Sequence, residues 1–281
     1  METRYGPASR KRICDSWALA VCLGTVVLLG LMWGMGLDAS DAAPGVSAQA
    51  AETVYHVQLR QNVNGYTGAS DTYINEGAPD ANFNDPSHWG ELQVRTGGPG
   101  KRALLRFDLA GQIPTGARIL TATLHLWTTS YRSADRPMTL ELYRLLQDWD
   151  ASQATWRSRL TGVPWEQAGA DGAGDREASP VSSVTVNAVN AEFTLDVTRA
   201  ISDWFGAPDT NKGFLLLPTA SSIVEYRFWA SDWSDPSKRP LLDIYYTFEP
   251  GVTPEPTATR TPTPTPTPTP VPGTVITSTV A

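Results

Sequence analysis

Aromatic, arginine and acidic side chains lie between the apolar residues of several alternating segments. They are Arg106, His125, Trp127, Glu141, Tyr143, Arg227 and Trp229. A flat ring can stack on the C–H face of a sugar, and a guanidinium or carboxylate can hydrogen bond to its hydroxyl groups. The pattern therefore favours a carbohydrate-binding surface, for which the candidate residues are Arg106, His125, Trp127, Tyr143, Arg227 and Trp229.

Packing is the alternative role for the aromatic residues. The chain has ten tryptophans, and most tryptophans in a folded domain contribute to its core or to sheet edges. For Trp149, Trp156 and Trp204 we favour packing. For Trp127 and Trp229 both roles remain open.

The residue patterns of enzymes are missing from the sequence. His56, His88 and His125 fall in unrelated segments, without HExxH or metal-ligand spacing, and there is no GxSxG nucleophile motif. Asp148 and Asp150 flank Trp149, but carboxylates two positions apart on a strand are too close for an inverting glycosidase pair, and a turn is the favoured interpretation. We expect a binding domain and no enzymatic activity.

An oxygen-rich loop between residues 75 and 90 is a candidate calcium site. Its side chains are Glu76, Asp80, Asn82, Asn84 and Asp85. Calcium takes six to eight oxygen ligands, but the spacing here does not match an EF-hand loop. A plain turn cluster is the favoured alternative, so the sequence predicts no certain cofactor and leaves a structural calcium ion open.

Net charge and cysteine usage narrow the classes of partner. The formal charge is −7, and the acidic excess lies within residues 51–250, which argues against nucleic acid as a partner. The only cysteines, Cys14 and Cys22, precede this region. The central region therefore lacks both a disulfide and a thiolate metal ligand.

The two ends of the chain differ in composition from its middle. Arg10-Lys11-Arg12 precedes an uncharged apolar segment at residues 17–37, and Asp38 follows it. This order predicts export to the cell surface or the medium by a signal peptide or signal anchor in residues 1–50. Cleavage near Ala48-Gln49-Ala50 is favoured over a retained transmembrane helix, and only a retained helix would contact the membrane. Residues 251–281 are rich in Thr-Pro dipeptides and predict a disordered, extended stalk.

Period-two alternation dominates residues 51–250. Ala103, Leu105, Phe107 and Leu109 form one apolar row, and Leu120, Ala122, Leu124 and Leu126 form the next. About eleven such strands are expected, together with one short helix near residues 197–206 that Asp196 or Thr198 would cap. The glycine-rich residues 169–174 should form an exposed loop. These patterns predict an all-β, two-sheet antiparallel sandwich of jelly-roll type.

A series of landmarks in residues 58–246 resembles the disaggregatase-related (DNRLRE) domain family, which is classed with the carbohydrate-binding modules of family 96. They are Asp71-Thr72-Tyr73-Ile74, the segment 102–109, Ile113-Pro114-Thr115-Gly116-Ala117, Trp149 with Thr155-Trp156, Asp196-Val197-Thr198 with Trp204, Asn211-Lys212-Gly213-Phe214, and Arg239-Pro240-Leu241. The hexapeptide that names the family is absent as such. The resemblance implies a β-sandwich on a surface protein, often appended to polysaccharide-active enzymes, and some members bind alginate.

Residues and resemblance together favour a non-catalytic, extracellular carbohydrate-binding module whose partner is a polysaccharide or cell-surface glycan. The alternative is a structural or adhesion domain of a surface protein that has no sugar ligand. A signal-like leader and a Thr-Pro tail fit both hypotheses equally.

Overall fold

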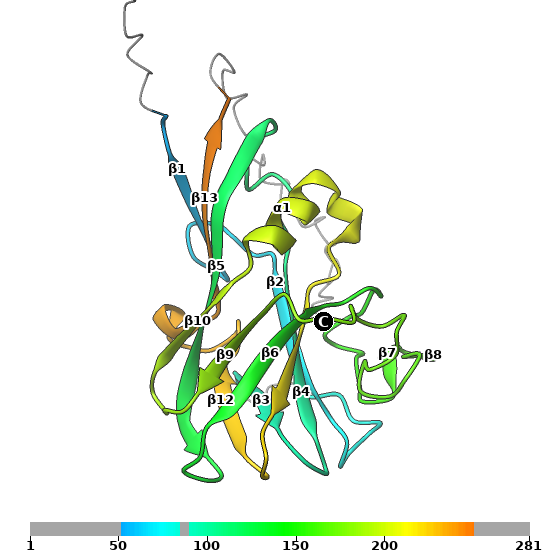
Figure 1. Cartoon of the computed structure of the whole chain (residues 1–281). Coiled ribbons are helices and arrows are strands. Elements are labelled where there is room, and N and C mark those ends of the chain that lie inside the picture. Colours follow the sequence, from blue (N-terminus) through cyan, green and yellow to red (C-terminus); the bar gives the residue numbers. More distant parts are fainter. Residues whose placement is uncertain (1–51, 85–89, 250–281) are drawn as a thin grey trace, which may run out of the picture. The chain divides into compact units, whose positions relative to one another are not determined.

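A computed structural model describes residues 52–84 and 90–249 (Figure 1). The predicted leader at residues 1–50, its apolar segment 17–37, the Thr-Pro tail at 251–281, Asp85 and His88 lie outside the described residues. Within the described part, no helix is both long and apolar enough to cross a membrane.

The described residues form thirteen strands, one α-helix and two short 3-10 helices. The strands are β1 (Tyr55–Arg60), β2 (Ala69–Asn75), β3 (Glu91–Arg95), β4 (Lys101–Phe107), β5 (Ala117–Arg132), β6 (Met138–Arg144), β7 (Ser158–Leu160), β8 (Val163–Pro164), β9 (Ser182–Val186), β10 (Glu192–Asp196), β11 (Phe214–Thr219), β12 (Glu225–Trp229) and β13 (Leu241–Phe248). The helices are α1 (Thr198–Gly206), η1 (Pro208–Thr210) and η2 (Pro236–Lys238). The predicted antiparallel, all-β architecture with one short α-helix is confirmed.

Eleven strands hydrogen bond into one continuous antiparallel sheet, in the order β1-β13-β5-β12-β3-β4-β11-β6-β9, with β10 paired to β5 and β2 paired to β4. We expected two separate sheets. The difference arises from β5, which is 16 residues long and has two successive partners along its length. Its first part pairs with β13 and its last part with β12, so β5 joins the two halves of a sheet that curls around the core.

The core confirms most of the predicted apolar rows. Ala122, Leu124 and Leu126 of β5 are fully buried, as are Tyr226 and Phe228 of β12. They belong to one large cluster enclosed by the curled sheet. Alternation places these side chains on the inner face and leaves the intervening residues on the outer face.

One predicted core residue of β5 is wrong. Leu120 is only half buried, while Ile119 beside it is buried. The register of β5 on β13 shifts here, from Thr121 opposite Tyr245 to Ile119 opposite Tyr246. The extra residue of this bulge reverses the phase of the side chains, so Ile119 takes the inward position.

A second, smaller core lies on the outer face of β4, β11 and β6. Leu104, Leu215 and Tyr143 project from these strands and pack against Trp149 and Trp165 of the connection between β6 and β9. This connection carries the two-stranded sheet of β7 and β8. The outer face of these strands is therefore covered by protein.

The glycine-rich residues 169–174 belong to this connection and form a loop, as predicted, but most of the loop is not exposed. Gly169, Ala170 and Gly172 are buried. Gly169 has φ +86°, and a Cβ there would lie 2.7 Å from the Trp156 ring. Glycine therefore serves close packing and a left-handed backbone at this point.

The helix α1 ends at Gly206, as the sequence predicts. Its N-cap residue is Val197, with no side-chain cap, so the predicted caps Asp196 and Thr198 are wrong. Instead, the Asp196 carboxylate accepts hydrogen bonds from the amide and hydroxyl of Thr198. These bonds hold the pKa of Asp196 below its usual value, although partial burial acts in the opposite direction. Trp204 of α1 packs on Phe214, with ring centroids 4.7 Å apart, and this contact seats the helix against the core.

The two ends of the described domain lie together. Arg118 of β5 forms ion pairs with both Glu52 and Glu249. Figure 1 shows the start of β1 and the end of β13 side by side, beyond the level of β10 and β12. The chain therefore enters and leaves the sheet at the same end.

Candidate functional site

Two of the predicted binding residues occupy neighbouring strands on the outer face of the sheet. Phe228 of β12 pairs with Thr128 of β5, and both are buried. The adjoining Trp229 and Trp127 therefore project outward from adjacent strands, and both are half buried. We call this region the tryptophan face, made of Arg60, His125, Trp127, Tyr131, Arg227, Trp229 and Trp233.

The Trp229 ring is paired with a second tryptophan ring. It stacks on Trp233 from the segment between β12 and β13, with ring centroids 3.8 Å apart and planes 16° apart. Gly90, at φ +59°, lies against Trp233, where a Cβ would come 2.8 Å from the ring. The paired rings are therefore held in place by backbone that only glycine fits comfortably.

Trp127 has a histidine and an arginine as neighbours. The His125 ring is roughly parallel to it at a centroid distance of 6.0 Å, and the Arg60 guanidinium sits over the indole at 5.2 Å. His125 Nδ1 pairs with the Glu192 carboxylate of β10. Burial lowers the pKa of Arg60, against the charges of Glu192 and Asp235, but an arginine stays charged at neutral pH.

Arg227 is held firmly within the tryptophan face. It donates hydrogen bonds to Glu91 and Glu225 at 2.9 and 3.2 Å, and its guanidinium stacks on Tyr131 at 3.8 Å. Burial lowers the pKa of Arg227, but the hydrogen bonds and charges of the two carboxylates outweigh it and raise the pKa overall. Tyr131 is 38% exposed, so this arrangement presents a further ring to solvent.

The other two predicted binding residues lie elsewhere. Arg106 and Tyr143 project from the outer face of β4 and β6, which the β6–β9 connection covers. The Arg106 guanidinium lies 5.4 Å from the Trp149 ring, and Tyr143 is buried, with Arg176 stacked on it at 4.3 Å. The structure thus brings together His125, Trp127, Arg227 and Trp229, and separates Arg106 and Tyr143 from them.

Sequence reasoning missed Arg60, Tyr131 and Trp233. Tyr131 continues the outward row of His125 and Trp127, and this extension was a usable signal. Arg60 reaches Trp127 only because β13 aligns β1 with β5, and Trp233 reaches Trp229 through an irregular turn. Neither contact has a periodic signature in the sequence.

The remaining tryptophans for which we favoured packing do pack. Trp149 and Trp204 are each 2% exposed, and Trp149 Nε1 donates to the Lys212 carbonyl at 2.7 Å. Trp156 is half buried beneath Arg102, at 5.1 Å.

The described side chains of the oxygen-rich loop point to separate protein partners. Glu76 accepts from the Gly100 amide and Asp80 pairs with Arg157. The side-chain amide of Asn82 donates to the carbonyls of Ala151 and Ala154, and its oxygen accepts from the Asn84 amide. Across residues 52–84 and 90–249, no three acidic, histidine or cysteine side chains form a group that could hold a metal ion.

The carboxylates that flank Trp149 lie outside the strands, and Asp150 begins a turn, as favoured from the sequence. Asp148 pairs with Lys212, and Asp150 accepts from the amide and hydroxyl of Ser152. Each carboxylate therefore has a local structural partner.

Comparison with known proteins identifies the family. The family model of the disaggregatase related repeat domain matches residues 71–244, which is more than half of the chain. The chain belongs to this family. No curated protein matches it. The match begins at Asp71 in β2 and ends at Ile244 in β13, so the disaggregatase-related repeat domain includes the helix α1, the β6–β9 connection and most of the tryptophan face.

Two landmarks that the sequence shares with this family, Asp71 and Arg239, form hydrogen bonds with segments distant in sequence. The buried Asp71 carboxylate accepts from the Ser231 amide at 2.7 Å, and Arg239 donates to the carbonyls of Trp233 and Gln61. Burial is the largest effect on Asp71 and raises its pKa to about 7. Both sets of hydrogen bonds hold the segment between β12 and β13 that carries Trp233. The family landmarks therefore support the tryptophan face.

Proposed function

We propose that this domain is a non-catalytic carbohydrate-binding module whose ligand is a polysaccharide or cell-surface glycan. The observation that carries the proposal is the tryptophan face, which presents the Trp229–Trp233 stack, Trp127 and Tyr131 on the outer side of adjoining strands. Flat, half-exposed rings beside charged side chains suit a ligand with alternating apolar faces and hydroxyl groups.

The expected affinity is modest. Covering one ring removes roughly 80 Å² of apolar surface from water, which stabilises a complex by about 2 kcal/mol. Two rings and one guanidinium, less the cost of association, give a dissociation constant between roughly 1 mM and 1 μM. Such a module works through avidity or by tethering a partner.

We further propose that the domain acts outside the cell, exported by residues 1–50 and spaced by the Thr-Pro segment. The joined ends of β1 and β13 support this proposal, because a domain attached at one end can present its remaining surface to a large ligand. In this proposal the curled sheet is a jelly-roll variant whose halves share β5.

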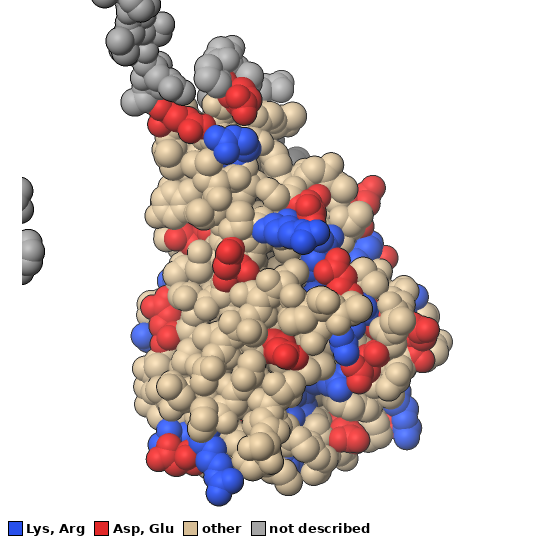
Figure 2. Space-filling model, in the orientation of Figure 1, with Lys and Arg blue, Asp and Glu red and all other residues tan. Residues whose placement is uncertain are grey.

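The charge on the face drawn in Figure 2 agrees with a ligand of low charge. Figure 2 shows acidic and basic side chains interspersed near α1, while the area over β9 and β10 is mostly uncharged. A mixed pattern without a large field of one sign does not favour attraction of a polyanion.

Retention on insoluble polysaccharides tests the proposed function. Trp127→Ala and Trp229→Ala should each weaken binding roughly 30-fold, the equivalent of one ring platform, with little change in melting temperature. Tyr245→Ala is the matched control, because Tyr245 is 39% exposed on the same side of the sheet and lies roughly 20 Å along β5 from Trp127. A loss of stability with retention intact would instead assign the two tryptophans to packing and favour a structural or adhesion domain.

A further inference from the structure

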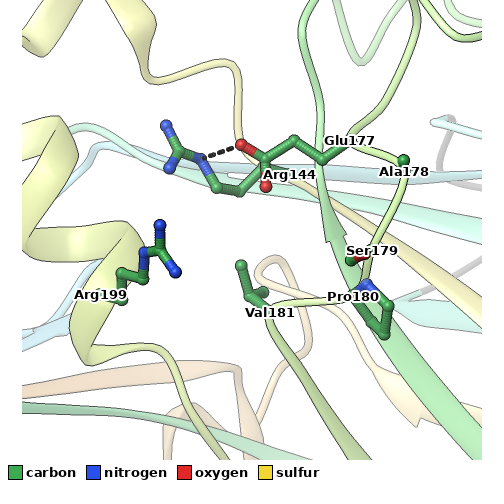
Figure 3. A pocket seen from close by; sticks show the side chains of 7 residues that line it. All are labelled: Arg144, Glu177, Ala178, Ser179, Pro180, Val181 and Arg199. Atoms are coloured by element: carbon green, nitrogen blue, oxygen red, sulfur yellow. Dashed lines mark ion pairs between the residues drawn. The ribbon is translucent and has the colours of Figure 1, made fainter.

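A pocket of about 430 Å³ with a mixed polar and apolar lining lies apart from the tryptophan face, between the end of β6, the start of α1 and the segment before β9. Figure 3 shows Arg144 and Arg199 approaching it from different elements, with Glu177 and Val181 on the remaining walls. We call it the arginine pocket. Its volume is in the range that accommodates a small organic ligand.

Backbone hydrogen bonds hold one wall of the pocket in shape. The Glu177 amide donates to the Arg144 carbonyl at 3.0 Å, and the Val181 amide donates to the Leu142 carbonyl at 2.8 Å. Between these two anchors, residues 178–180 arch away from β6. The arch places the Ser179 hydroxyl and the Pro180 ring at the pocket and leaves all three residues exposed.

Arg144 forms one wall of the arginine pocket, and two carboxylates hold its side chain in place and balance its charge. Its side chain is 15% exposed, Nη1 lies 2.8 Å from Asp203, and Nε lies 3.4 Å from a Glu177 oxygen. That Nε–H is buried and makes no hydrogen bond, because its contact with Glu177 is an ion pair of poor hydrogen-bond geometry.

Arg199 is the free donor of the pocket. It is exposed, and it has no ion pair or hydrogen bond from its side chain among the described residues. Figure 3 shows its guanidinium directed from α1 toward Val181 and Arg144. Five N–H donors on a planar group can bind two neighbouring oxygens at once.

The charges around the pocket decide the ligand class. Glu177 of the lining and Asp203 both pair with Arg144. The two carboxylates equal the two arginines in charge, so a carboxylate or sulfate entering here would meet Glu177 as well as the arginines. A neutral hydroxyl group can accept from a guanidinium and donate to Glu177 at the same time. Val181 and Pro180 add an apolar surface for a ring face.

We propose that the arginine pocket binds one neutral saccharide unit through its hydroxyl groups, with Arg199 donating and Glu177 accepting. The proposal rests on the proposed function for its ligand class, but it uses a different surface. The domain would then hold a glycan chain at the tryptophan face and a single unit, such as a chain end, in the pocket.

Nuclear magnetic resonance of the full-length protein tests this proposal. The probes are methyl glycosides of glucose, mannose, galactose and xylose, with sodium sulfate and glucuronate as anionic probes. At least one neutral glycoside should shift the Arg144 and Arg199 Nε–H signals and the Val181 amide. Arg199→Gln should weaken this binding at least about tenfold, the loss expected for a hydrogen bond to a charged group, and Arg199→Lys should restore part of it.

Arg136→Gln is the matched control, because Arg136 is also exposed and lies beyond the other end of β6. This variant should bind the glycoside like the unmodified protein. The proposal is overturned by shifts with sulfate or glucuronate alone, by no shift with any glycoside, or by unchanged affinity in Arg199→Gln. Trp127→Ala should leave the pocket signals unchanged, so failure of the pocket and failure of the tryptophan face are separate results.

Discussion

At the residue scale, the tryptophan face depends on buried polar groups as well as on its rings. The buried Asp71 of β2 accepts a hydrogen bond from the amide of Ser231, which lies between the two stacked tryptophans in sequence. A buried acceptor at this point fixes the turn that separates Trp229 from Trp233. Burial of the Asp71 carboxylate removes it from water, and this desolvation disfavours its ionised form.

Asp71 predicts a specific pH dependence of stability. Its pKa is raised to about 7 in the folded state by burial, partly offset by the Ser231 hydrogen bonds, so the folded protein holds this proton more tightly than the unfolded chain. The stabilisation is complete below pH 4 and is lost as the pH rises to about 7, by on the order of a few kcal/mol.

Asp71→Asn keeps an oxygen acceptor for the Ser231 amide but removes the titration. Its free energy of unfolding should exceed that of the unmodified protein at pH 8, and the difference should shrink toward pH 5. Urea unfolding at several pH values measures this. A difference that stays constant with pH would show that Asp71 does not titrate in this range.

At the element scale, the β6–β9 connection is a built layer, although it has few regular strands. Asp175 is 1% exposed, and its carboxylate accepts hydrogen bonds from the amides of Glu166, Gln167 and Gly172. This single side chain therefore organises the turn that holds the Gly169 carbonyl against Arg102.

Asp175→Ala should lower the free energy of unfolding by about 3 kcal/mol or more, because three amides lose a buried, charged acceptor. Urea denaturation gives the value. Asp148→Ala serves as the control, since Asp148 makes one exposed ion pair and its loss should cost less than about 1 kcal/mol. Equal effects of the two substitutions would contradict the structural role of Asp175.

Elements with a local signal were predictable from the sequence. Alternation in β4, β5, β12 and β13 revealed their inward rows, and the continuous apolar run from Phe214 revealed that β11 is covered on both faces. The bulge at Leu120 and the burial of Gly169 were not predictable, because each depends on a partner distant in sequence. For the same reason, Arg106 and Tyr143 looked like binding residues until the connection was seen to cover them.

At the scale of the whole molecule, one curled sheet has outer faces of different character. The outer face of β4, β11 and β6 is covered by the connection, whereas the outer face around β5 and β12 carries half-exposed rings. Both ends of the described domain lie together at Arg118. This division of surfaces is the basis for assigning ligand binding to the tryptophan face.

A glycan array probed in parallel with the full-length protein and its Trp127→Ala/Trp229→Ala double variant tests the central claim most directly. The account predicts that the unmodified protein marks a defined set of glycans and that the double variant, folded to the same melting temperature within a few degrees, marks none of them. A blank array for the unmodified protein, or the same spots for both proteins, would contradict it.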